Sequence, residues 1–390
     1  MADILKWCGS LTLDNVILLI MMIFAIIGAI DRTLDNRYGY GAAFEEGFGT
    51  MGPLALAVAA VYAAAPLIAR CLTPIATSIS DIIGSDSGTL PGLLISADMG
   101  GYAICTQMAS SDALGNFGGL IIASTVGTIW FFTIPIALSI LKEDDLPLLA
   151  AGLLCGLVTM PIGCFVGGLL MNTTTFTLSL SAIVYNILPL MALAIVVGAA
   201  LWFIPNKTIN FFRILGKIVI AVITLLTAVL IFEQVTGIHT PILGTLVTED
   251  ESGSTMFNQG LLLCGKIAIV LAGAFPMIKW LQKHCSGIFR RIGNSLGINS
   301  VASIGLLSSC ANCIPTFATM KDMDSRGKLL NSAFIAGGSF ALGDFLGFAA
   351  GVEPKMVFPM IGAKLTCGIT AIILAQLLYP VLQKRLGIHS

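Results

Sequence analysis

Few ionisable side chains lie inside the apolar stretches of this chain, and they are the first candidates for chemistry. Asp98, Asp344 and Lys364 lie well within apolar stretches, and Glu45 and Glu46 lie beside one. A charge in an apolar environment costs free energy unless it is paired or faces water. Each of these residues is therefore expected either to form an ion pair or to bind a ligand.

Asp344 and Lys364 are suited to pair with each other. Asp344 precedes and Lys364 follows a short link at residues 351–355, so two antiparallel segments joined there would place both side chains at similar depth. A structural ion pair is one interpretation, because an unpaired charge in lipid is costly. The other interpretation is that Asp344 binds a ligand directly.

Asp98 stands in the string A-D-M-G-G, with no oppositely charged residue near it in sequence. At the tip of a broken helix, Asp98, Met99, Gly100 and Gly101 would lie where exposed backbone lines a cavity. Asp98 would there offer its charge to a cationic ligand. Alternatively, its carboxylate caps the first turn of the following helix, and the two roles can coexist.

Glu45 and Glu46 precede a helix that is expected from about Phe48, and Phe44 lies directly before them. Acidic side chains at a helix N-terminus are stabilised by the helix dipole, so a solvated helix start is one interpretation. The alternative is an acidic vestibule that concentrates cations, in which the rings of Phe44 and Phe48 face an ammonium group. Glu46 is on that account a candidate binding residue.

The string S-S-C-A-N-C-I-P, which contains Cys310, Asn312 and Cys313, also interrupts an apolar segment. The Cys-x-x-Cys spacing occurs in metal sites, but no second cysteine pair or histidine cluster accompanies it, so no metal site is expected. Asn312 can bond to a hydroxyl or ammonium group of a ligand, or it can close a hairpin by hydrogen bonds. The chain has no catalytic or nucleotide-binding fingerprint, so neither enzymatic activity nor a cofactor is expected.

The composition indicates which elements must position these residues. Hydrophobic residues make up 56% of the 390 residues and charged residues 11%, whereas soluble domains carry about 25% charged residues. Residues 15–30, 117–141, 178–204 and 218–232 contain no Lys, Arg, Asp or Glu, which is typical of membrane-spanning helices. The net charge of -1 provides no basic surplus for nucleic acid. We therefore expect an all-α polytopic membrane protein that lies in the lipid bilayer.

Apolar runs between polar breaks predict about eleven hydrophobic segments. They are residues 14–30, 48–69, 89–108, 117–141, 148–171, 178–204, 211–236, 259–282, 299–320, 329–351 and 356–380. Segments 89–108 and 299–320 carry polar residues and glycines in their middle. We predict that both are broken or re-entrant, with tips near Asp98 to Gly101 and Ala311 to Pro315.

Basic residues predict the orientation in the membrane. Residues 205–217 and 283–291 carry lysines and arginines without acidic companions, and both are expected to be cytoplasmic. They flank residues 237–258, which contain the run Glu249-Asp250-Glu251 and no Lys or Arg. This loop is expected to be external.

A re-entrant segment changes the side of everything that follows it. If 299–320 returns to the face that it entered, the basic residues of 321–328 and of the C-terminal tail are cytoplasmic, as the positive-inside rule requires. If 89–108 re-enters as well, Arg32 and Arg37 lie inside but Lys6 and Arg70 lie outside, so the first half does not settle its own orientation.

The two polar-tipped segments are similar strings. GLLISADMGG (Gly92 to Gly101) and GLLSSCANCI (Gly305 to Ile314) are each followed by a short charged link and a glycine-rich segment. This arrangement is typical of transporters built from two inverted repeats. We predict a first transmembrane repeat at residues 1–176, a linking transmembrane helix at 177–206 and a second repeat at 207–390.

Small residues favour close helix packing at several places. They are Gly28, Gly152 with Gly156, and Gly163 with Gly167 and Gly168. The sequence does not decide whether these faces meet within one chain or between the copies of a homo-oligomer.

A set of strings spread over about residues 44 to 380 carries a resemblance to a known family, the ethanolamine utilisation permeases of bacterial membranes. The strings are F-E-E-G-F (Phe44 to Phe48), A-D-M-G-G (Ala97 to Gly101), P-I-G-C (Pro161 to Cys164), F-I-P-x-K-x-I-N (Phe203 to Asn210), M-K-x-M-D-x-R-G-K (Met320 to Lys328), F-A-L-G-D-x-L-G-F-A-A (Phe340 to Ala350) and F-P-M-I (Phe358 to Ile361) with Lys364-Leu365. The set is specific, although no single string is.

The resemblance implies uptake of ethanolamine across the cytoplasmic membrane for its degradation. Ethanolamine carries an ammonium and a hydroxyl group, so its site needs carboxylates or aromatic faces for one end and an amide or hydroxyl for the other. Asp98, Asn312, Asp344 and Glu46 supply such groups. One alternative is transport of another small cationic or zwitterionic metabolite, with proton or cation coupling. The alternative outside transport is a membrane sensor or enzyme that uses the two cysteines of the Cys-x-x-Cys string.

Two positions depart from the family. The position after Asp344, associated with histidine in the family, is Phe345, and the position after Asn312, associated with a second asparagine, is Cys313. No titrating histidine therefore stands beside Asp344 for proton coupling.

Overall fold

The computed structural model describes residues 13–241, 243–247 and 254–386, which fold into helices without any β-strand. The predicted acidic run Glu249-Asp250-Glu251 lies outside the described residues. The α-helices are α2 (Leu13–Thr33), α3 (Tyr40–Gly49), α4 (Met51–Leu54), α5 (Ala60–Ile83), α6 (Leu90–Leu94), α7 (Gly101–Met108), α8 (Asp112–Asn116), α9 (Ile134–Ile140), α10 (Leu146–Met171), α11 (Leu180–Phe203), α12 (Pro205–Thr236), α13 (Met256–Leu296), α14 (Ser300–Ala311), α15 (Ile314–Thr319), α16 (Ser325–Gly338), α17 (Asp344–Val352) and α18 (Val357–Leu386).

Shorter helical elements of other types join or continue these helices. The π-helices are η1 (Ala55–Ala59), η4 (Phe117–Gly127) and η5 (Ile129–Thr133). The 3-10 turns are η2 (Ser87–Thr89), η3 (Ala97–Met99), η6 (Glu143–Asp145), η7 (Gly244–Leu246), η8 (Met320–Asp322) and η9 (Pro354–Met356).

In the described part of the chain, 7 helical stretches are long and apolar enough to cross a membrane. They are Leu13–Thr33, Tyr40–Ile83, Glu143–Met171, Leu180–Phe203, Lys207–Thr236, Met256–Leu296 and Pro354–Arg385. Each overlaps one predicted segment, so the all-α polytopic membrane fold is confirmed. The other four predicted segments are broken or of mixed helix type, and the number of eleven stays a prediction.

Residues 87–109 form a broken, re-entrant segment, here named hairpin 1. After α6 ends at Leu94 the backbone is extended, and Gly100 is left-handed, with φ 94°, directly before α7. A Cβ on Gly100 would lie 1.9 Å from Cγ1 of Val61, so only glycine fits this turn. Ser87 Oγ donates a hydrogen bond of 2.9 Å to the carbonyl of Met108, which joins the two ends of the hairpin. The predicted break in segment 89–108 is confirmed.

Residues 299–324 form the second such segment, hairpin 2. Its first arm α14 ends at Ala311, Asn312 is extended, and the second arm α15 begins at Ile314. Pro315 occupies the first turn of α15, where a backbone N–H would have no partner within the helix, so proline costs no helical hydrogen bond there. The break lies within the predicted tip, Ala311 to Pro315, and confirms it.

Hydrogen bonds fold the arms of hairpin 2 against each other. Inside the hairpin, Ser309 Oγ donates to Thr316 Oγ1 at 2.8 Å, and Thr316 Oγ1 donates to the carbonyl of Gly305 at 3.0 Å. At its open end, the backbone N–H of Asn299 donates to Oδ1 of Asp324 at 2.9 Å. The chain therefore returns to the side from which it came.

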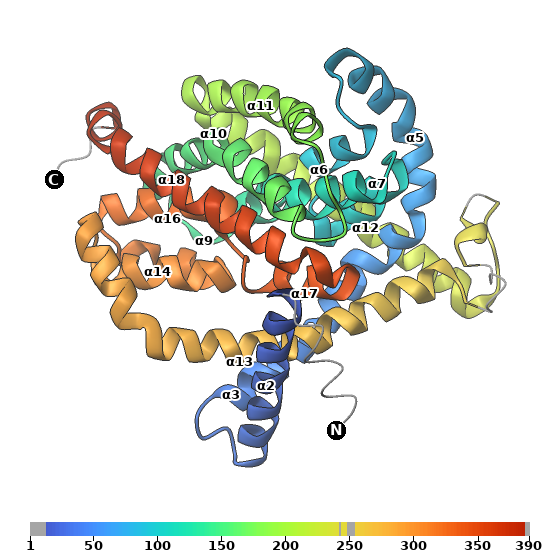
Figure 1. Ribbon diagram of the computed structural model, residues 1–390, viewed down its shortest axis with the longest axis horizontal. Helices are drawn as coiled ribbons and strands as arrows, with labels where there is room; N and C mark the ends of the chain where they lie inside the picture. Colours follow the sequence, from blue (N-terminus) through green and yellow to red (C-terminus); the bar gives the residue numbers. More distant parts are fainter. Residues whose placement is uncertain (1–12, 242, 248–253, 387–390) are drawn as a thin grey trace.

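The two hairpins enter from opposite ends of the long helix α13. Met256, the first residue of α13, lines a cavity together with Gln107 at the open end of hairpin 1. Hairpin 2 begins directly after Leu296, the last residue of α13. In Figure 1, α18 runs between the region of α6 and α7 and the region of α14. Two hairpins of opposite direction are what an inverted arrangement needs, although the division into repeats at 1–176 and 207–390 stays a prediction.

Contacts place part of the predicted cytoplasmic segments near the open end of hairpin 2. Gln376 Nε2 on α18 donates a hydrogen bond of 3.4 Å to the carbonyl of Leu296, so this part of α18 lies beside the end of α13. Arg385 donates a hydrogen bond of 2.6 Å to the carbonyl of Trp202, which joins the end of α18 to the end of α11. Nζ of Lys283 lies 5.9 Å from the centroid of the Tyr38 ring, so the loop with Arg32 and Arg37 lies beside the second half of α13.

The core is built around α10, which packs against α16 and α18 (Figure 1). A Cβ on Gly152 would lie 2.4 Å from Cβ of Ser332, and a Cβ on Gly163 would lie 2.1 Å from Sγ of Cys367. These small residues therefore let helices approach within one chain. The predicted halves pack into each other, because α10 comes from the first half and its partners come from the second.

Four local expectations differ from the structure. The predicted loops 205–217 and 283–291 are helical and belong to α12 and α13, because amphipathic basic sequence continues these helices beyond their apolar part. Glu45 and Glu46 lie inside α3 and not before a helix. Segment 329–351 is broken at Ser339–Gly343 into α16 and α17. Segment 117–141 is helical, but much of it is π-helix.

Candidate functional site

Asp98 lies in the turn η3 at the tip of hairpin 1, half-buried. Ser96 Oγ donates a hydrogen bond to its Oδ1. The carboxylate also interacts electrostatically with the backbone N–H of Met99 and with the ammonium group of Lys364. Helix α7 has Gly100 at its N-cap position and no side-chain cap. Asp98 therefore stabilises the turn before α7 and does not cap α7 itself.

Met99, Gly100 and Gly101 shape the tip around Asp98. A Cβ on Gly101 would lie 2.4 Å from the carbonyl oxygen of Ile95, and Gly100 packs against Val61. Met99 packs against the hydrophobic core. These three residues supply close packing and backbone groups but no polar side chain.

Lys364 on α18 is directed to the first half of the chain. Its Nζ donates a hydrogen bond to the carbonyl of Ser124 in η4 and lies 4.5 Å from the centroid of the Phe345 ring. The side chain is 1% exposed. Within the described residues no salt bridge joins Lys364 to Asp344, and the ion pair stays a prediction. The groups that contact Lys364 in the structure are the Ser124 carbonyl and the Phe345 ring.

Asp344 is the first residue of α17, where the unbonded N–H groups of the helix favour a negative charge. Its carboxylate has no hydrogen-bond or salt-bridge partner in the part of the chain that the structure describes. The charged groups that act electrostatically on Asp344 are Asp98 and Glu46, and both are acidic. Asp344 is therefore a half-buried carboxylate available to a cation.

Asn312 combines the two roles that the sequence left open. Its Oδ1 accepts a hydrogen bond of 2.8 Å from the backbone N–H of Ile314, which closes the tip of hairpin 2. Its Nδ2 has no partner among the described residues. The amide N–H groups therefore remain as donors for a ligand.

A cavity of about 180 Å³ brings Asn312 and Glu46 together. It is lined by Ala43, Glu46, Phe275, Ile278, Lys279, Gln282, Ser308, Ala311, Asn312 and Pro315. Asp98 and Asp344 do not line this cavity, although the charge of Glu46 acts on Asp344. Two of the predicted binding residues thus share one cavity, and the other two lie near the tip of hairpin 1 and at the start of α17.

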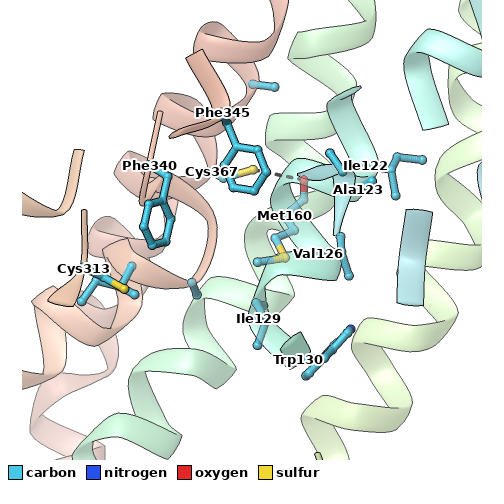
Figure 2. Packing of buried hydrophobic residues seen from close by; sticks show 14 of the residues in the cluster. Ile122, Ala123, Val126, Ile129, Trp130, Met160, Cys313, Phe340, Phe345 and Cys367 are labelled. Atoms are coloured by element: carbon cyan, nitrogen blue, oxygen red, sulfur yellow. Dashed lines mark hydrogen bonds between the residues drawn. The ribbon is translucent and has the colours of Figure 1, made fainter. Parts of the chain in front are cut away.

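Sequence reasoning missed two groups that hold Lys364. Phe345 stood out only as a departure from the family, yet its ring faces the lysine ammonium group. The Ser124 carbonyl could not be found, because no sequence signal marks η4 as a π-helix. Figure 2 shows Phe340 and Phe345 on one side of the buried core and Ile122, Val126 and Trp130 on the other.

Cys310 and Cys313 behave as small packing residues. Both side chains are buried, and Cys310 Sγ donates a weak hydrogen bond of 3.5 Å to the carbonyl of Leu306 inside α14. They hold hairpin 2 in the core, as small apolar side chains do.

The arrangement is suited to hold a small cation. Asp98, Asp344 and Glu46 are linked electrostatically, and Lys364 is the basic group that acts on Asp98. These three carboxylates outnumber the two nearby ammonium groups, Lys364 and Lys279 in the cavity with Glu46, so the surroundings favour a further cation. Bare backbone at both tips and the Asn312 amide add neutral hydrogen-bonding groups.

Comparison with known proteins identifies the relatives of the chain. The family model described as ethanolamine utilisation protein, EutH, matches residues 13–378. No solved structure matches the chain.

Three relatives carry the name probable ethanolamine permease EutH. The protein of Listeria monocytogenes is 39% identical over 362 residues, which cover 93% of this chain and 93% of the relative. The proteins of Salmonella typhimurium and Escherichia coli are each 37% identical over 396 residues, which cover 94% of this chain and 96% of the relative. The similarity therefore extends over nearly the whole chain.

Proposed function

Because the chain belongs to the EutH family of ethanolamine utilisation proteins and is a multi-pass bacterial membrane protein, we propose that it takes up ethanolamine across the cytoplasmic membrane. Its relatives are named as permeases. The observation that carries the proposal is the pair of opposed hairpins with carboxylates at and beside their tips. Re-entrant hairpins expose backbone at mid-membrane, where it must line a path or be buried in protein.

The surroundings of Lys364 support an ammonium group as the part that is recognised. A lysine side chain ends in a primary alkylammonium group, as ethanolamine does. Lys364 is held by an aromatic face at 4.5 Å, by the Ser124 carbonyl and by the field of Asp98. The same region therefore already accommodates the chemical group that the substrate would bring.

The remaining groups would meet the substrate at different points of the path. Asp98 at the tip of hairpin 1 would hold the ammonium group, with Asp344 and Glu46 extending the negative field along the path. The Nδ2 of Asn312 would donate to the hydroxyl oxygen. On the positive-inside rule, the end with hairpin 2 and the 180 Å³ cavity faces the cytoplasm.

Another small cationic or zwitterionic metabolite is the alternative substrate, with proton or cation coupling. A zwitterion would bring a carboxylate into a region with three carboxylates, and the resulting repulsion favours a simple cation.

Uptake by the purified protein in liposomes tests the proposal. Labelled ethanolamine should enter protein-containing vesicles faster than empty ones, and unlabelled ethanolamine should compete. Ethylene glycol, which lacks the ammonium group, and alanine, a zwitterion, should compete poorly. Equal competition by alanine would favour the alternative, and the absence of any protein-dependent uptake would contradict a permease for ethanolamine. An imposed proton or sodium gradient in the same vesicles separates passive from coupled transport.

A further inference from the structure

We propose that the cavity at the open end of hairpin 1 is a second binding site for a primary alkylammonium ion. An ion that enters from outside the cell would bind there before it reaches the hairpin tips. This inference deepens the proposed function and rests on it, because the occupant is the same substrate. The cavity measures about 440 Å³ and is lined by residues of α5, hairpin 1, α8 and α13, among others. We call it the outer vestibule.

An unpaired buried acceptor belongs to the wall of the outer vestibule. Asn116 lines the cavity and is 4% exposed, and its Oδ1 has no hydrogen-bond partner in the described structure. The orientation of this amide is fixed, because its Nδ2 donates to the carbonyl of Asp112 at 2.9 Å and a carbonyl only accepts. A buried acceptor without a donor is costly. An ammonium or hydroxyl group from a ligand would supply the missing donor.

Aromatic faces line the same cavity. They come from Tyr62, Tyr102 and Phe176. Phe176 already attracts an ammonium group, since Nζ of Lys355 lies 5.9 Å from its ring centroid. Aromatic faces bind alkylammonium ions through the negative face of the ring. The lining therefore suits a cation with an apolar stem.

Two carboxylates give the cavity its charge. Asp112 and Glu353 line it, and both act electrostatically on the phenol of Tyr102. None of the described residues that line the cavity is a Lys or an Arg. Acidic groups in a partly enclosed cavity raise the local concentration of cations.

Tyr102 connects the outer vestibule to the candidate site. It lies in the first turn of α7, directly after Gly100 and Gly101 at the tip that carries Asp98. It also lines a neighbouring cavity of about 350 Å³ next to Gly351 and Val352, at the end of the helix that begins with Asp344. Tyr102 thus joins the outer vestibule to the hairpin tip with Asp98, while Asp344 lies at the far end of α17 from the neighbouring cavity.

Protection of a cysteine against labelling tests this site. Thr106 is exposed in the outer vestibule, so Thr106→Cys gives a reporter when it is made together with Cys71→Ser and Cys285→Ser, which remove the exposed and the partly exposed thiol of the described residues. A membrane-impermeant maleimide is added to intact cells, with or without ethanolamine. The decisive background is Asp98→Asn, in which the central site is weakened.

We expect ethanolamine and ethylammonium, but not ethylene glycol, to slow labelling several-fold and saturably, also in the Asp98→Asn background. Asn116→Leu and, separately, Glu353→Gln should abolish or strongly reduce this protection, whereas Asn116→Asp, which keeps an acceptor, should retain it. The glutamine variant serves as the test if the leucine variant does not fold.

Three results would overturn the second site. They are loss of protection in the Asp98→Asn background, full protection in both lining variants, and labelling only after the cells are permeabilised. Wild-type uptake is measured in parallel. Uptake without protection leaves the proposed function intact and removes the outer site, whereas protection without uptake removes the permease and keeps the site.

Discussion

The two hairpins perform the same structural task by different means. Hairpin 1 packs its tip against the π-helix η4, where a Cβ on Gly127 would lie 2.5 Å from the carbonyl oxygen of Ile95, and Trp130 Nε1 donates to the carbonyl of Leu93 at 3.1 Å. Hairpin 2 packs its tip against the break between α16 and α17. There the backbone N–H groups of Phe340 and Leu342 donate to the carbonyls of Ser309 and Cys310, at 2.9 and 2.8 Å.

The difference shows how a membrane protein can satisfy the carbonyls of an interrupted helix. A side-chain donor and a neighbouring helix serve hairpin 1, while backbone donors of a second break serve hairpin 2. The charge is placed differently as well. Hairpin 1 carries Asp98 on its own tip, whereas hairpin 2 carries an amide and receives a carboxylate, Asp344, from the helix that it packs against.

The largest expected effect comes from removing the charge of the hairpin 1 tip. Asp98→Asn keeps the size of the side chain and should reduce uptake of ethanolamine about 100-fold, since a charged hydrogen bond contributes about 3 kcal/mol and each 1.4 kcal/mol is about tenfold. Initial rates in liposomes at low substrate concentration measure it.

Two variants make this result interpretable. Asp98→Glu keeps the charge and should only weaken uptake, and Asn312→Ala at the neutral tip should reduce uptake less than Asp98→Asn does. If the Asp98→Asn protein folds and transports at the wild-type rate, Asp98 serves only the turn. The recognition site would then have to be sought around Asp344 and Glu46.

Gly343→Ala should be the most damaging small change at hairpin 2. Its Cβ would lie 2.1 Å from the carbonyl oxygen of Ala311, so the break and the hairpin tip cannot keep their contact. Overpacking of this kind lowers the free energy of unfolding by about 1–3 kcal/mol. Thermal unfolding of the detergent-solubilised protein measures it, with Gly49→Ala as control, because a Cβ on Gly49 meets nothing within 4 Å. Equal melting temperatures for both variants would show that the tip of hairpin 2 is loose.

Much of the fold could be predicted from the sequence, because lipid imposes simple rules. Long apolar runs predicted the spanning helices, and the mid-segment polar residues near Asp98 and Asn312 predicted both hairpins. The break at Ser339–Gly343 was missed, because F-A-L-G-D is apolar enough to continue a helix. The backbone donors that this break offers to hairpin 2 compensate for the lost helical bonds, and that compensation exists only in the folded protein.

The sequence named the candidate residues but not the groups that they contact. Asp98, Asp344, Lys364 and Asn312 were found because polar groups are rare in apolar segments. Which carboxylate Lys364 faces depends on the rotation of α18 and on a carbonyl of the π-helix, and helical periodicity does not fix either. The Asn116 acceptor was missed because a buried asparagine is normally satisfied.

The hydrogen bonds that stabilise the two hairpins should contribute differently to the free energy of unfolding. Thr316→Val removes the hydroxyl that links Ser309 to Gly305, leaves the buried Ser309 donor without a partner, and should lower the free energy of unfolding by about 2 kcal/mol. Trp130→Phe removes one bond to hairpin 1 and should cost about 1 kcal/mol. Denaturant unfolding measures both. If Trp130→Phe lowers the free energy of unfolding more than Thr316→Val does, the bond from Trp130 to hairpin 1 stabilises the protein more than the bonds inside hairpin 2.

The smallest expected effect, and the one that separates two views of the site, belongs to Asp344→Asn. If Asp344 were paired with Lys364, removing its charge would strand a buried ammonium group and cost about 3–5 kcal/mol of unfolding free energy. In the structure its charged neighbours are Asp98 and Glu46, so the change relieves repulsion and loses only the favourable field of the α17 N-terminus. These contributions oppose each other, and the melting temperature of Asp344→Asn should stay close to that of the wild type.

Lys364→Met, in contrast, should lower the melting temperature, because Asp98 then keeps only Ser96 and backbone groups as partners. In the Asp344→Asn, Lys364→Met double variant the melting temperature should stay below that of the wild type, since Asp98 still loses Lys364 and Asp344 is coupled to Lys364 only through Asp98. Recovery of stability in the double variant would restore the ion pair and move Lys364 from the tip of hairpin 1 to the start of α17.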